Sequence, residues 1–478
     1  MMDIFAEQNI YLITIIFLKI QVEKYKEHLQ ICEGKNMNHV HQQELTEAAR
    51  VADVATSVKP TRIRYYMLAL ILFATIINFV DRSSLGILAP FISKDLTLDK
   101  VQMGQIFAAF GLTYAFALVP GGIIADVLGS RIAYAFSLIT WSLATMTQGL
   151  AGGFNMLFGS RLAIGALEAP AFPSNARAVT MWFPTGERGF ATSVYVMGQY
   201  IGTPLFTGLL LWIANGFGWR SAFYLTGGAG LIFGILWYIW YRDPLNHRSA
   251  NEAELKHIRE GGGLVGKKER DRFDWKNALR LLKHRQILAI CLGKFCNNAI
   301  LVFFTTWFMT YLVEERQMTM IKVGIFQALP FLGATAGILL AGFFSDFFIR
   351  RGYSMSVARK APLIIGTLLG SSILLVNFVT SNEIIIVILT ISFFAQGVGS
   401  SSWAAVSEIA PRQYIGLTSS ITSLAANIAG VTTPIMIGYI LHVTGQFFWA
   451  LNMMGIMCLI GAFAYSFLLG PLSRIEMD

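Results

Sequence analysis

Long apolar runs, separated by short polar segments, constrain this chain more than any other feature of its sequence. A helix needs about 20 predominantly apolar residues to cross the hydrocarbon core of a bilayer, and runs of about this length recur along the chain. They lie at 65–89, 103–125, 132–150, 156–176, 190–214 and 221–241, and then at 286–312, 323–347, 361–380, 384–410, 415–441 and 447–470. We therefore predict an all-α membrane protein with twelve transmembrane helices in two six-helix halves.

The composition agrees with a membrane protein and excludes several other classes. Charged residues make up 14% of the 478 residues, against about 25% in soluble domains, so a soluble globular fold is excluded. The net charge of +9 comes from bases between the apolar runs. These bases do not form the continuous basic stripe of a nucleic-acid-binding protein, so we expect no nucleic-acid partner. The sequence has no Gly-x-Ser-x-Gly or His-Glu-x-x-His motif and no Cys/His cluster at metal spacing, so we expect no enzyme, cofactor or metal site.

The polar segments divide the chain into five parts. We predict a cytoplasmic N-terminal extension (1–60), an N-terminal six-helix bundle (61–241), a cytoplasmic linker (242–285), a C-terminal six-helix bundle (286–472) and a short cytoplasmic tail (473–478). The apolar run at 10–20 within the extension is too short to span a bilayer. Two interpretations stay open for the extension: an anchor on the membrane surface, or a translation start at Met37 that leaves a short polar tail. We favour the second.

Lys and Arg are unequally distributed between alternate loops. The loops on the side of the termini carry Arg62, Arg64, Arg131, Arg188, the basic linker, Arg350, Arg351, Arg359, Lys360, Arg412 and Arg474, whereas the opposite loops carry Lys94, Lys100, Arg220, Arg316 and Lys322. Because Lys and Arg resist translocation, we predict that both termini are cytoplasmic. The absence of any Asn-x-Ser/Thr sequon and of a large external loop favours the bacterial inner membrane.

The same short motif follows the second run of each half. It reads Gly-Gly-Ile-Ile-Ala-Asp126-Val-Leu-Gly-Ser-Arg131 in the first half and Gly-Phe-Phe-Ser-Asp346-Phe-Phe-Ile-Arg350 in the second. The leading glycine allows two helices to approach closely, and the Asp and Arg can form charge-assisted hydrogen bonds to a neighbouring helix end. We predict that these four charged residues form a gate that favours one access state.

Four charged residues lie inside the predicted spans. Asp81 and Arg82 belong to the first run, and Arg161 and Glu168 belong to the fourth. Since a charge within a bilayer costs several kcal/mol unless it is paired or hydrated, each is a candidate functional residue. On a helix, Asp81 and Arg82 point about 100° apart, whereas Arg161 and Glu168 share one face about 10 Å apart.

Two acids and two bases in one site can exchange partners, which suits the uptake and release of a proton. The chain has no Gly-x-x-x-x-Gly-Lys-Ser/Thr loop, so energy must come from an ion gradient or from the gradient of the substrate itself. The alternative is a static ion pair that holds the first and fourth spans together. We favour proton coupling, with Asp81, Glu168 and Arg161 as its residues.

Several motifs resemble those of a known family. The repeated Asp and Arg motif resembles the loop signature of the major facilitator superfamily. Within it, Phe79-Val-Asp-Arg-Ser, Gly165-Ala-Leu-Glu-Ala-Pro-Ala-Phe-Pro, Trp182-Phe-Pro and Ser401-Ser-Trp resemble the anion:cation symporters, in particular the bacterial sugar-acid proton symporters for galactonate and glucarate. The resemblance implies a major facilitator fold, with two six-helix halves around a central cavity.

The resemblance also implies residue roles. Asp81 and Glu168 match the acids that take part in proton coupling, and Arg82 matches the Arg that binds the substrate carboxylate, for which a planar guanidinium is suited. The implied contacts to the rest of the substrate come from Tyr114, Gln199 and Trp403, and we add Ser402, Asn297, Asn298 and Asn427 as further candidates. For Tyr114, an aromatic contact between spans is an equally supported interpretation.

The chain departs from the family pattern at four positions. Val127 stands where the superfamily has Arg, and Phe79 and Ser423 stand where galactonate-type proteins have Tyr and Asn. Lys294 stands where they have Gln, which adds a cation to the seventh span. Lys294 either recognises a second carboxylate, which would favour an aldarate over an aldonate, or forms an ion pair with Glu408. We favour the ion pair.

These observations lead to one functional prediction. We expect a proton-coupled symporter that imports a sugar-acid anion of the galactonate or glucarate type by alternating access. Its partners would be a small organic anion, protons and the lipid bilayer, and a monomer is expected. The alternative within transporters is a carrier or antiporter of another organic anion, such as a hexuronate or phthalate. A membrane enzyme or a sensor lacks support from any motif or effector domain.

Overall fold

The computed structural model describes residues 60–264, 280–399, 402–411 and 415–475, apart from some side chains within the helices. Nearly all of the predicted N-terminal extension, part of the linker and the last three residues of the tail lie outside this description. The described residues form helices joined by short loops and contain no strand. The prediction of an all-α fold is therefore confirmed.

The helices fall into two groups along the chain. The first group consists of α3 (Ile63–Asp95), α4 (Lys100–Gln148), α5 (Phe154–Glu168), α6 (Ala171–Trp182), α7 (Arg188–Phe217) and α8 (Trp219–Trp240), and the short polar helix α9 (Glu252–Glu260) follows it. The second group consists of α11 (Arg285–Thr306), α12 (Phe308–Thr310), α13 (Met320–Arg350), α14 (Met355–Gly370), α15 (Asn382–Gly399), α16 (Ser402–Ile409), α17 (Ile415–Thr444) and α18 (Phe448–Phe463). Short 3-10 or π-helical segments at Tyr311–Glu315, Ser371–Phe378 and Ala464–Leu468 continue α12, α14 and α18.

Ten helices of the described chain are long and apolar enough to cross a membrane, against the twelve apolar runs of the sequence. The difference has two local causes. Helix α4 covers two predicted runs and is interrupted at Gly129, whose φ of 76° is a conformation that glycine adopts readily. The fourth predicted run is divided into α5 and α6 around Pro170, because proline lacks the N–H that would continue the helical hydrogen bonds.

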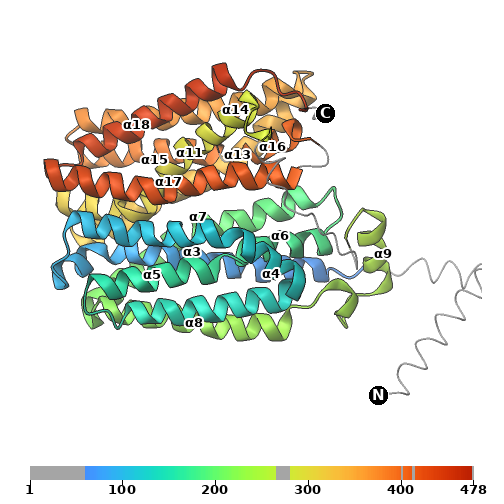
Figure 1. Ribbon diagram of the computed structural model, residues 1–478, viewed down its shortest axis with the longest axis horizontal. Helices are drawn as coiled ribbons and strands as arrows, with labels where there is room; N and C mark the ends of the chain where they lie inside the picture. The colour runs from blue at the N-terminus through green and yellow to red at the C-terminus, as the bar shows by residue number, and fades with distance from the viewer. Residues whose placement is uncertain (1–59, 265–279, 400–401, 412–414, 476–478) are drawn as a thin grey trace, which may run out of the picture. The chain divides into compact units, whose positions relative to one another are not determined.

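Each group packs mainly within itself. In the first group α4 contacts α5, α6 and α8, and α3 contacts α7; in the second group α13 contacts α15, and α11 contacts α17. Figure 1 shows the blue-to-green helices of the first group beside the yellow-to-red helices of the second. The groups meet where α4 contacts α17, where α7 contacts α13, and where α3 contacts α11 and α12.

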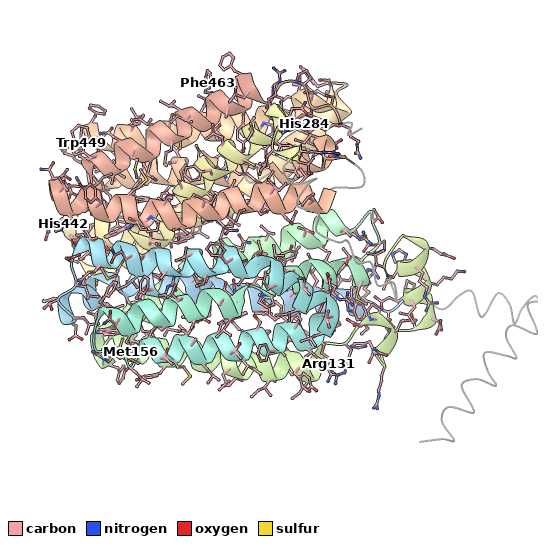
Figure 2. All side chains as sticks on the ribbon, viewed as in Figure 1. Arg131, Met156, His284, His442, Trp449 and Phe463 are labelled. Atoms are coloured by element: carbon pink, nitrogen blue, oxygen red, sulfur yellow. The ribbon has the colours of Figure 1, made fainter. Side chains whose placement is uncertain are left out.

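The helix surfaces carry apolar side chains on the outside as well as in the core. Phe116, Trp212 and Phe378 are among many large apolar residues that are exposed. An outer surface of this kind fits a protein surrounded by lipid. Figure 2 shows Arg131 and His284 at the end of the helices that carries α9, here called the α9 end, and Met156, His442 and Trp449 at the opposite end. The helices thus run between two ends with an apolar exterior.

Glycines allow the two groups to touch through their backbones. A Cβ added at Gly86 of α3 would collide with the backbone carbonyl of Thr305 in α11, and one at Gly104 of α4 would collide with the carbonyl of Pro434 in α17. Since larger side chains at these places would force the helices apart, the close contact depends on glycine.

We expect Gly86→Ala to lower the thermal stability of the purified protein by several degrees, because overpacking a tight contact costs about 1–3 kcal/mol. Gly208→Ala is the matched control, since a Cβ at Gly208 in α7 meets nothing within 4 Å. The measurement is the midpoint of thermal unfolding in detergent. Equal midpoints for the two variants would contradict the role of Gly86 in joining the groups.

Candidate functional site

Asp81 and Arg82 of α3 point to different helices, as expected from their 100° separation. The Asp81 carboxylate is buried and accepts a hydrogen bond from the indole N–H of Trp141 in α4 at 3.0 Å. The Arg82 guanidinium forms a hydrogen-bonded ion pair with Glu168, the last residue of α5. Adjacent residues of α3 therefore tie it to two other helices of the first group.

The Arg82 guanidinium lies among aromatic rings. Its central carbon lies 4.7 Å from the ring centroids of Phe110 and Tyr114, 4.9 Å from that of Phe79 and 5.8 Å from that of Phe172. A cation is attracted to the face of an aromatic ring, and these rings leave 19% of the Arg82 side chain exposed. Tyr114 stacks on Phe110, one turn earlier in α4, so both rings present themselves to Arg82 from the same helix.

Small residues let Glu168 reach Arg82. A Cβ added at Gly165, three residues before Glu168, would collide with the Phe110 carbonyl and the Thr113 hydroxyl of α4. Thr113 Oγ1 also donates a hydrogen bond to the carbonyl of Leu162 in α5 at 2.7 Å. The close approach of α5 to α4 thus places the Glu168 carboxylate among the residues around Arg82.

Several buried polar atoms near this pair lack a hydrogen-bond partner in the described structure. They are Asp81 Oδ1, Glu168 Oε2, Arg161 Nε and Nη1, and both amide atoms of Asn78. Arg161 is buried with its guanidinium over the ring of Phe110 at 5.0 Å. Buried polar atoms without partners are costly, so a set of them in one place marks a region that can bind a polar group. Asn78, one helical turn before Arg82, is the member that sequence analysis missed.

Other predicted substrate residues lie elsewhere in the described chain. Asn298 Nδ2 donates to the Ala426 carbonyl at 2.7 Å, and Asn427 Nδ2 donates to the Ser423 carbonyl at 3.1 Å. Gln199 is half-buried in α7, Ser402 is buried in α16, and the side chain of Trp403 lies outside the description.

A hydrogen bond between the two groups was not foreseen. The Tyr200 hydroxyl of α7 donates to Gln396 Oε1 of α15 at 3.3 Å. Both side chains are buried, and Asn297 Nδ2 donates to the Gln396 carbonyl at 3.5 Å. The signal in the sequence was a pair of polar residues within apolar runs, next to the predicted residue Gln199. The bond places polar groups of α7, α11 and α15 together.

Lys294 has a hydroxyl as its hydrogen-bond partner. Its ammonium, buried in α11, donates to Thr422 Oγ1 of α17 at 3.2 Å. This hydrogen bond joins α11 to α17. Glu408, the partner that we favoured, is half-buried in α16, and its ion pair with Lys294 stays a prediction.

The first copy of the repeated motif is anchored through its arginine. Arg131 Nε donates to the Tyr238 carbonyl in the last turn of α8 at 3.0 Å, and its guanidinium lies over the Tyr238 ring at 4.3 Å. Asp126 is exposed in α4. The side chains of Asp346 and Arg350 lie outside the description, so the second copy of the predicted gate is not described.

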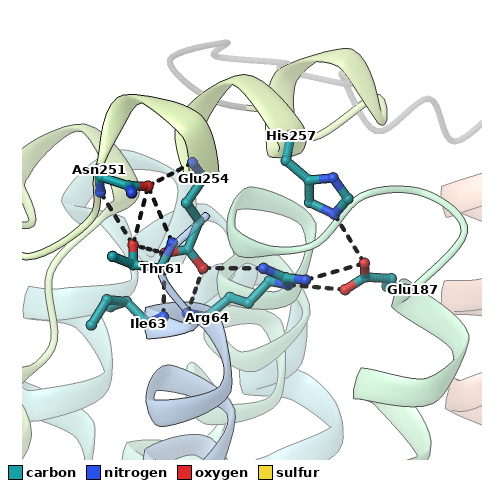
Figure 3. A network of polar contacts seen from close by, with 7 residues as sticks. All are labelled: Thr61, Ile63, Arg64, Glu187, Asn251, Glu254 and His257. Carbon is teal, nitrogen blue, oxygen red and sulfur yellow. Dashed lines mark hydrogen bonds and ion pairs between the residues drawn. The ribbon is translucent and has the colours of Figure 1, made fainter. Parts of the chain in front are cut away.

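A polar network attaches α9 to the first group (Figure 3). Glu254 is fully buried and accepts hydrogen bonds from the Thr61 hydroxyl at 2.5 Å, from the Ile63 and Arg64 N–H groups at 3.2 Å each, and from the Arg64 guanidinium at 3.3 Å. A carboxylate at the first N–H groups of a helix is favoured by the helix dipole and satisfies donors that have no partner within the helix. Glu254 thus caps α3 from another part of the chain.

Glu187 extends this network between α7 and α9. Its carboxylate accepts a hydrogen bond from Arg64 Nε at 3.0 Å and lies 3.0 Å from the His257 ring (Figure 3). Burial raises the pKa of Glu187, but the hydrogen bonds from His257 and Arg64 outweigh it and hold the pKa below its usual range. Because this pKa is lowered, its contribution to docking is present at neutral pH and is lost as the pH falls through the lowered value.

The described residues include no group of three His, Cys, Asp or Glu side chains that could hold a metal ion. The charged groups of the site are instead arranged as one ion pair, Arg82 with Glu168, and two neighbouring charges, Asp81 and Arg161. This arrangement can bind an anion or a proton. An anion can take the place of Glu168 at Arg82, and a proton on Glu168 removes the negative charge that Arg82 pairs with.

Comparison with known proteins defines the class. A model of the Major Facilitator Superfamily matches residues 71–358, and the chain belongs to this superfamily. The resemblance predicted from the motifs is confirmed, and the chain is a transporter rather than an enzyme. Its helices also align with the crystal structure of a bacterial homologue of the human lysosomal transporter Spinster, with a TM-score of 0.67 at 18% identity, over 84% of this chain and 96% of the other.

Two relatives are more similar in sequence. A protein of Bacillus subtilis named a probable galactarate/D-glucarate transporter is 36% identical, over 89% of this chain and 96% of its own length. A D-galactonate transporter of Escherichia coli is 38% identical, over 88% of this chain and 98% of its own length. Both matches extend over nearly the full length of the relatives, so the similarity covers both helix groups.

We expect Glu254→Ala to release α9, because the variant leaves the first N–H groups of α3 and the Arg64 guanidinium without their acceptor. Amide hydrogen exchange of residues 252–260 and 61–65 should accelerate about tenfold or more at neutral pH. Glu260→Ala is the control, since Glu260 is exposed and its ion pair in the described part of the chain, with Lys256 at 3.8 Å, lies within α9. Unchanged exchange in Glu254→Ala would show that the network does not hold α9.

Proposed function

We propose that this protein is a proton-coupled symporter that imports a sugar-acid anion by alternating access. The observation that carries the proposal is the ion pair between the partly buried Arg82 and the fully buried Glu168. An arginine is the side chain best suited to a carboxylate, and here it already holds one that belongs to the protein. A substrate carboxylate and Glu168 therefore compete for the same guanidinium.

We propose an architecture of twelve transmembrane helices in two six-helix halves. Helix α4 would supply two spans, separated at Gly129, and α5 with α6 would form one span divided at Pro170. The first half would cover 61–241 and the second 286–472, with 242–285 as the linker. These boundaries agree with the two helix groups and with the repeated motif.

We place the α9 end and both termini in the cytoplasm, in the inner membrane of a bacterium. The basic residues predicted on that side include Arg131, which lies at the α9 end (Figure 2), and Lys and Arg are retained on the cytoplasmic side of membrane proteins. The N-terminal extension (1–60) and the tail (473–478) would then be cytoplasmic. A single chain would be the transporting unit, because the Arg82–Glu168 pair lies within one chain.

The mechanism follows from the competition for Arg82. When a proton neutralises Glu168, the ion pair weakens and Arg82 accepts the substrate carboxylate in its place. Arg82 lies within a span and is largely buried among aromatic rings, so a charged guanidinium without an anion would be costly. Loss of the proton restores the pair with Glu168 and releases the substrate. Asp81 and Arg161 would contribute one negative and one positive charge next to Arg82 and Glu168, and so influence how readily Glu168 takes up a proton.

The remaining candidate residues would bind the hydroxyl groups of the substrate and control access. Tyr114 lies beside Arg82, and Gln199, Ser402, Trp403, Asn297, Asn298 and Asn427 supply hydroxyl, indole and amide groups on α7, α11, α16 and α17. Polyhydroxy anions need donors and acceptors of this kind. Asp126, Arg131, Asp346 and Arg350 would form the gate at the α9 end.

The names of the relatives support the class of substrate. The two described above are named for galactarate, D-glucarate and D-galactonate, which are sugar acids that carry carboxylates. A hexuronate transporter of Bacillus subtilis is 29% identical over 80% of this chain. Hexuronates are therefore the second candidate class, with a single carboxylate and a ring or aldehyde in place of an open polyol chain.

The first test is uptake of labelled galactarate, galactonate and glucuronate into liposomes that contain the purified protein, with and without an inward proton gradient. We expect accumulation of galactarate or galactonate above equilibrium only when the gradient is present. Equilibration without accumulation would replace symport by facilitated diffusion. Preferential uptake of glucuronate would favour the hexuronate alternative.

We expect Glu168→Gln to retain exchange of substrate across the membrane but to lose accumulation driven by the proton gradient, by at least about tenfold. Glutamine keeps the size and a hydrogen-bonding oxygen but cannot take up a proton. Substrate exchange and gradient-driven uptake are measured in the same liposomes, with Glu260→Gln as an exposed control. Uphill uptake by Glu168→Gln at the rate of the unmodified protein would remove Glu168 from the coupling role.

A further inference from the structure

The two oxygens of the buried Asp81 carboxylate differ in their surroundings. Oδ2 accepts the hydrogen bond from the indole of Trp141 in α4, whereas Oδ1 has no hydrogen-bond partner among the described residues. A proton that reaches Asp81 is therefore expected on Oδ1, because Oδ2 already holds a donor. The groups that lie beside Trp141 along α4 bear on how such a proton arrives.

Two further polar residues share the face of α4 that carries Trp141. Thr145 and Gln148 follow it by four and seven residues, which places them within about 40° of it around the helix and about 6 and 10 Å further along the axis. Both side chains are fully buried. Gln148 is the last residue of α4, and Met156, in the first turn of α5, lies at the end opposite the α9 end (Figure 2). The row therefore leads from Asp81 toward that end.

The polar atoms of this row are buried without partners in the described part of the chain. Thr145 Oγ1 and both amide atoms of Gln148 lack a hydrogen bond. Thr140 and Thr147, in the same part of α4, instead donate to backbone carbonyls of their own helix at 2.8 and 2.7 Å. Buried polar groups without partners are the usual sites of internal water, which makes about three hydrogen bonds to such groups. The row can thus hold water molecules beside Asp81.

Helices α3, α4 and α8 meet closely around this row. A Cβ added at Gly227 of α8 would lie 2.7 Å from the Ser142 carbonyl oxygen, and one at Gly230 would collide with the Ser142 hydroxyl and lie 3.5 Å from Ile77 of α3. The Ser142 hydroxyl is also buried without a partner among the described residues. The junction of the three helices is therefore tight at the backbone and polar at its side chains.

The other direction along α4 is occupied by aromatic rings. Toward the α9 end, the same face carries Tyr134, whose ring stacks on Trp237 of α8 at 4.5 Å, and Trp237 stacks on Tyr241 at 4.6 Å. The Tyr134 hydroxyl has no partner in the described chain, which makes it a matched comparison for Thr145. Large rings thus lie on the side that we assign to the cytoplasm, and the polar row lies on the side of the cell exterior.

We propose that Thr145 and Gln148 hold a file of water molecules through which protons enter from the cell exterior to Asp81. The inference rests on the proposed function, because it supplies the route for the proton of the symport. A proton from external water would bind the water at Gln148, each water would pass on one proton as it receives one, and Asp81 Oδ1 would take the last. The carboxylate becomes a neutral acid, and one proton leaves the exterior. The Thr145 hydroxyl both accepts and donates, so it can stay bonded to water throughout this transfer.

The test compares Thr145→Val and Gln148→Met with the unmodified protein in liposomes that contain a pH-sensitive dye. Both variants keep the size of the side chain and remove its strong hydrogen-bonding groups. We expect the proton uptake that accompanies downhill entry of galactarate or galactonate to slow at least about fivefold in each variant, because the relay of polar groups is broken. Exchange of labelled for unlabelled substrate should remain close to that of the unmodified protein, because exchange needs no net movement of protons.

Three control variants separate the route from a structural role. Thr147→Val removes a hydroxyl that bonds its own helix, and Tyr134→Phe removes an unpartnered hydroxyl on the other side of Trp141. We expect both to leave proton uptake and exchange unchanged. Thr145→Ser keeps the hydroxyl and should retain most of the proton uptake.

The outcomes separate this inference from the proposed function. If substrate entry in the unmodified protein carries no protons, the proposed symport and the route both fail. If it carries protons and Thr145→Val and Gln148→Met keep its rate, symport stands and the route is overturned. Equal losses of proton uptake and of exchange, at an unchanged midpoint of thermal unfolding, would assign the two residues to helix movement and would also overturn the route. The variants alter separate side chains, so either one that folds decides the question.

Discussion

The ion pair between Arg82 and Glu168 is the interaction on which the described site depends. Two charges buried in a membrane protein are tolerated only when each has a partner and the surroundings are fixed. Here the partners come from α3 and α5, and the aromatic rings around Arg82 come from α3, α4 and α6. The pair can form only because Gly165 allows α5 to lie against α4. The close packing at Gly165 thus brings Glu168 to Arg82, and the ion pair between them in turn holds α5 in this position.

The ends of the helices are held by different interactions. At the α9 end, Glu254 and Glu187 fasten α9 to α3 and α7 through hydrogen bonds to Arg64. Toward the opposite end, the groups meet through the backbone contacts of Gly86 and Gly104 and through an ion pair between Lys100 and Glu314. Contacts through the backbone have no side chain to rearrange, so helices that meet in this way can separate and return as rigid bodies. Such contacts between the groups would allow the alternating access that we propose.

The sequence predicted the helices well, because an apolar run of span length has few alternatives. It also predicted that Asp81 and Arg82 face different neighbours, since a helix separates adjacent side chains by about 100°. It offered an ion pair between the first and fourth spans as an alternative, without naming Arg82 and Glu168 as its members. It did not identify Trp141 as the partner of Asp81, because the two lie 60 residues apart and meet only when the helices pack. The hydrogen bond from Lys294 to Thr422, 128 residues further along the chain, was not foreseen for the same reason.

The placement of the Arg82 site within the first helix group limits what a charge bound there can do. A ligand shifts an equilibrium between two states only through contacts that differ between them. The partners of Asp81 and Arg82 in the described structure, Trp141 and Glu168, both belong to the first group. A carboxylate that replaced Glu168 at Arg82 would therefore contact the first group alone through its charge. Movement of the two groups would then have to come from contacts of the rest of the substrate with the second group, which approaches α3 through α11 and α12.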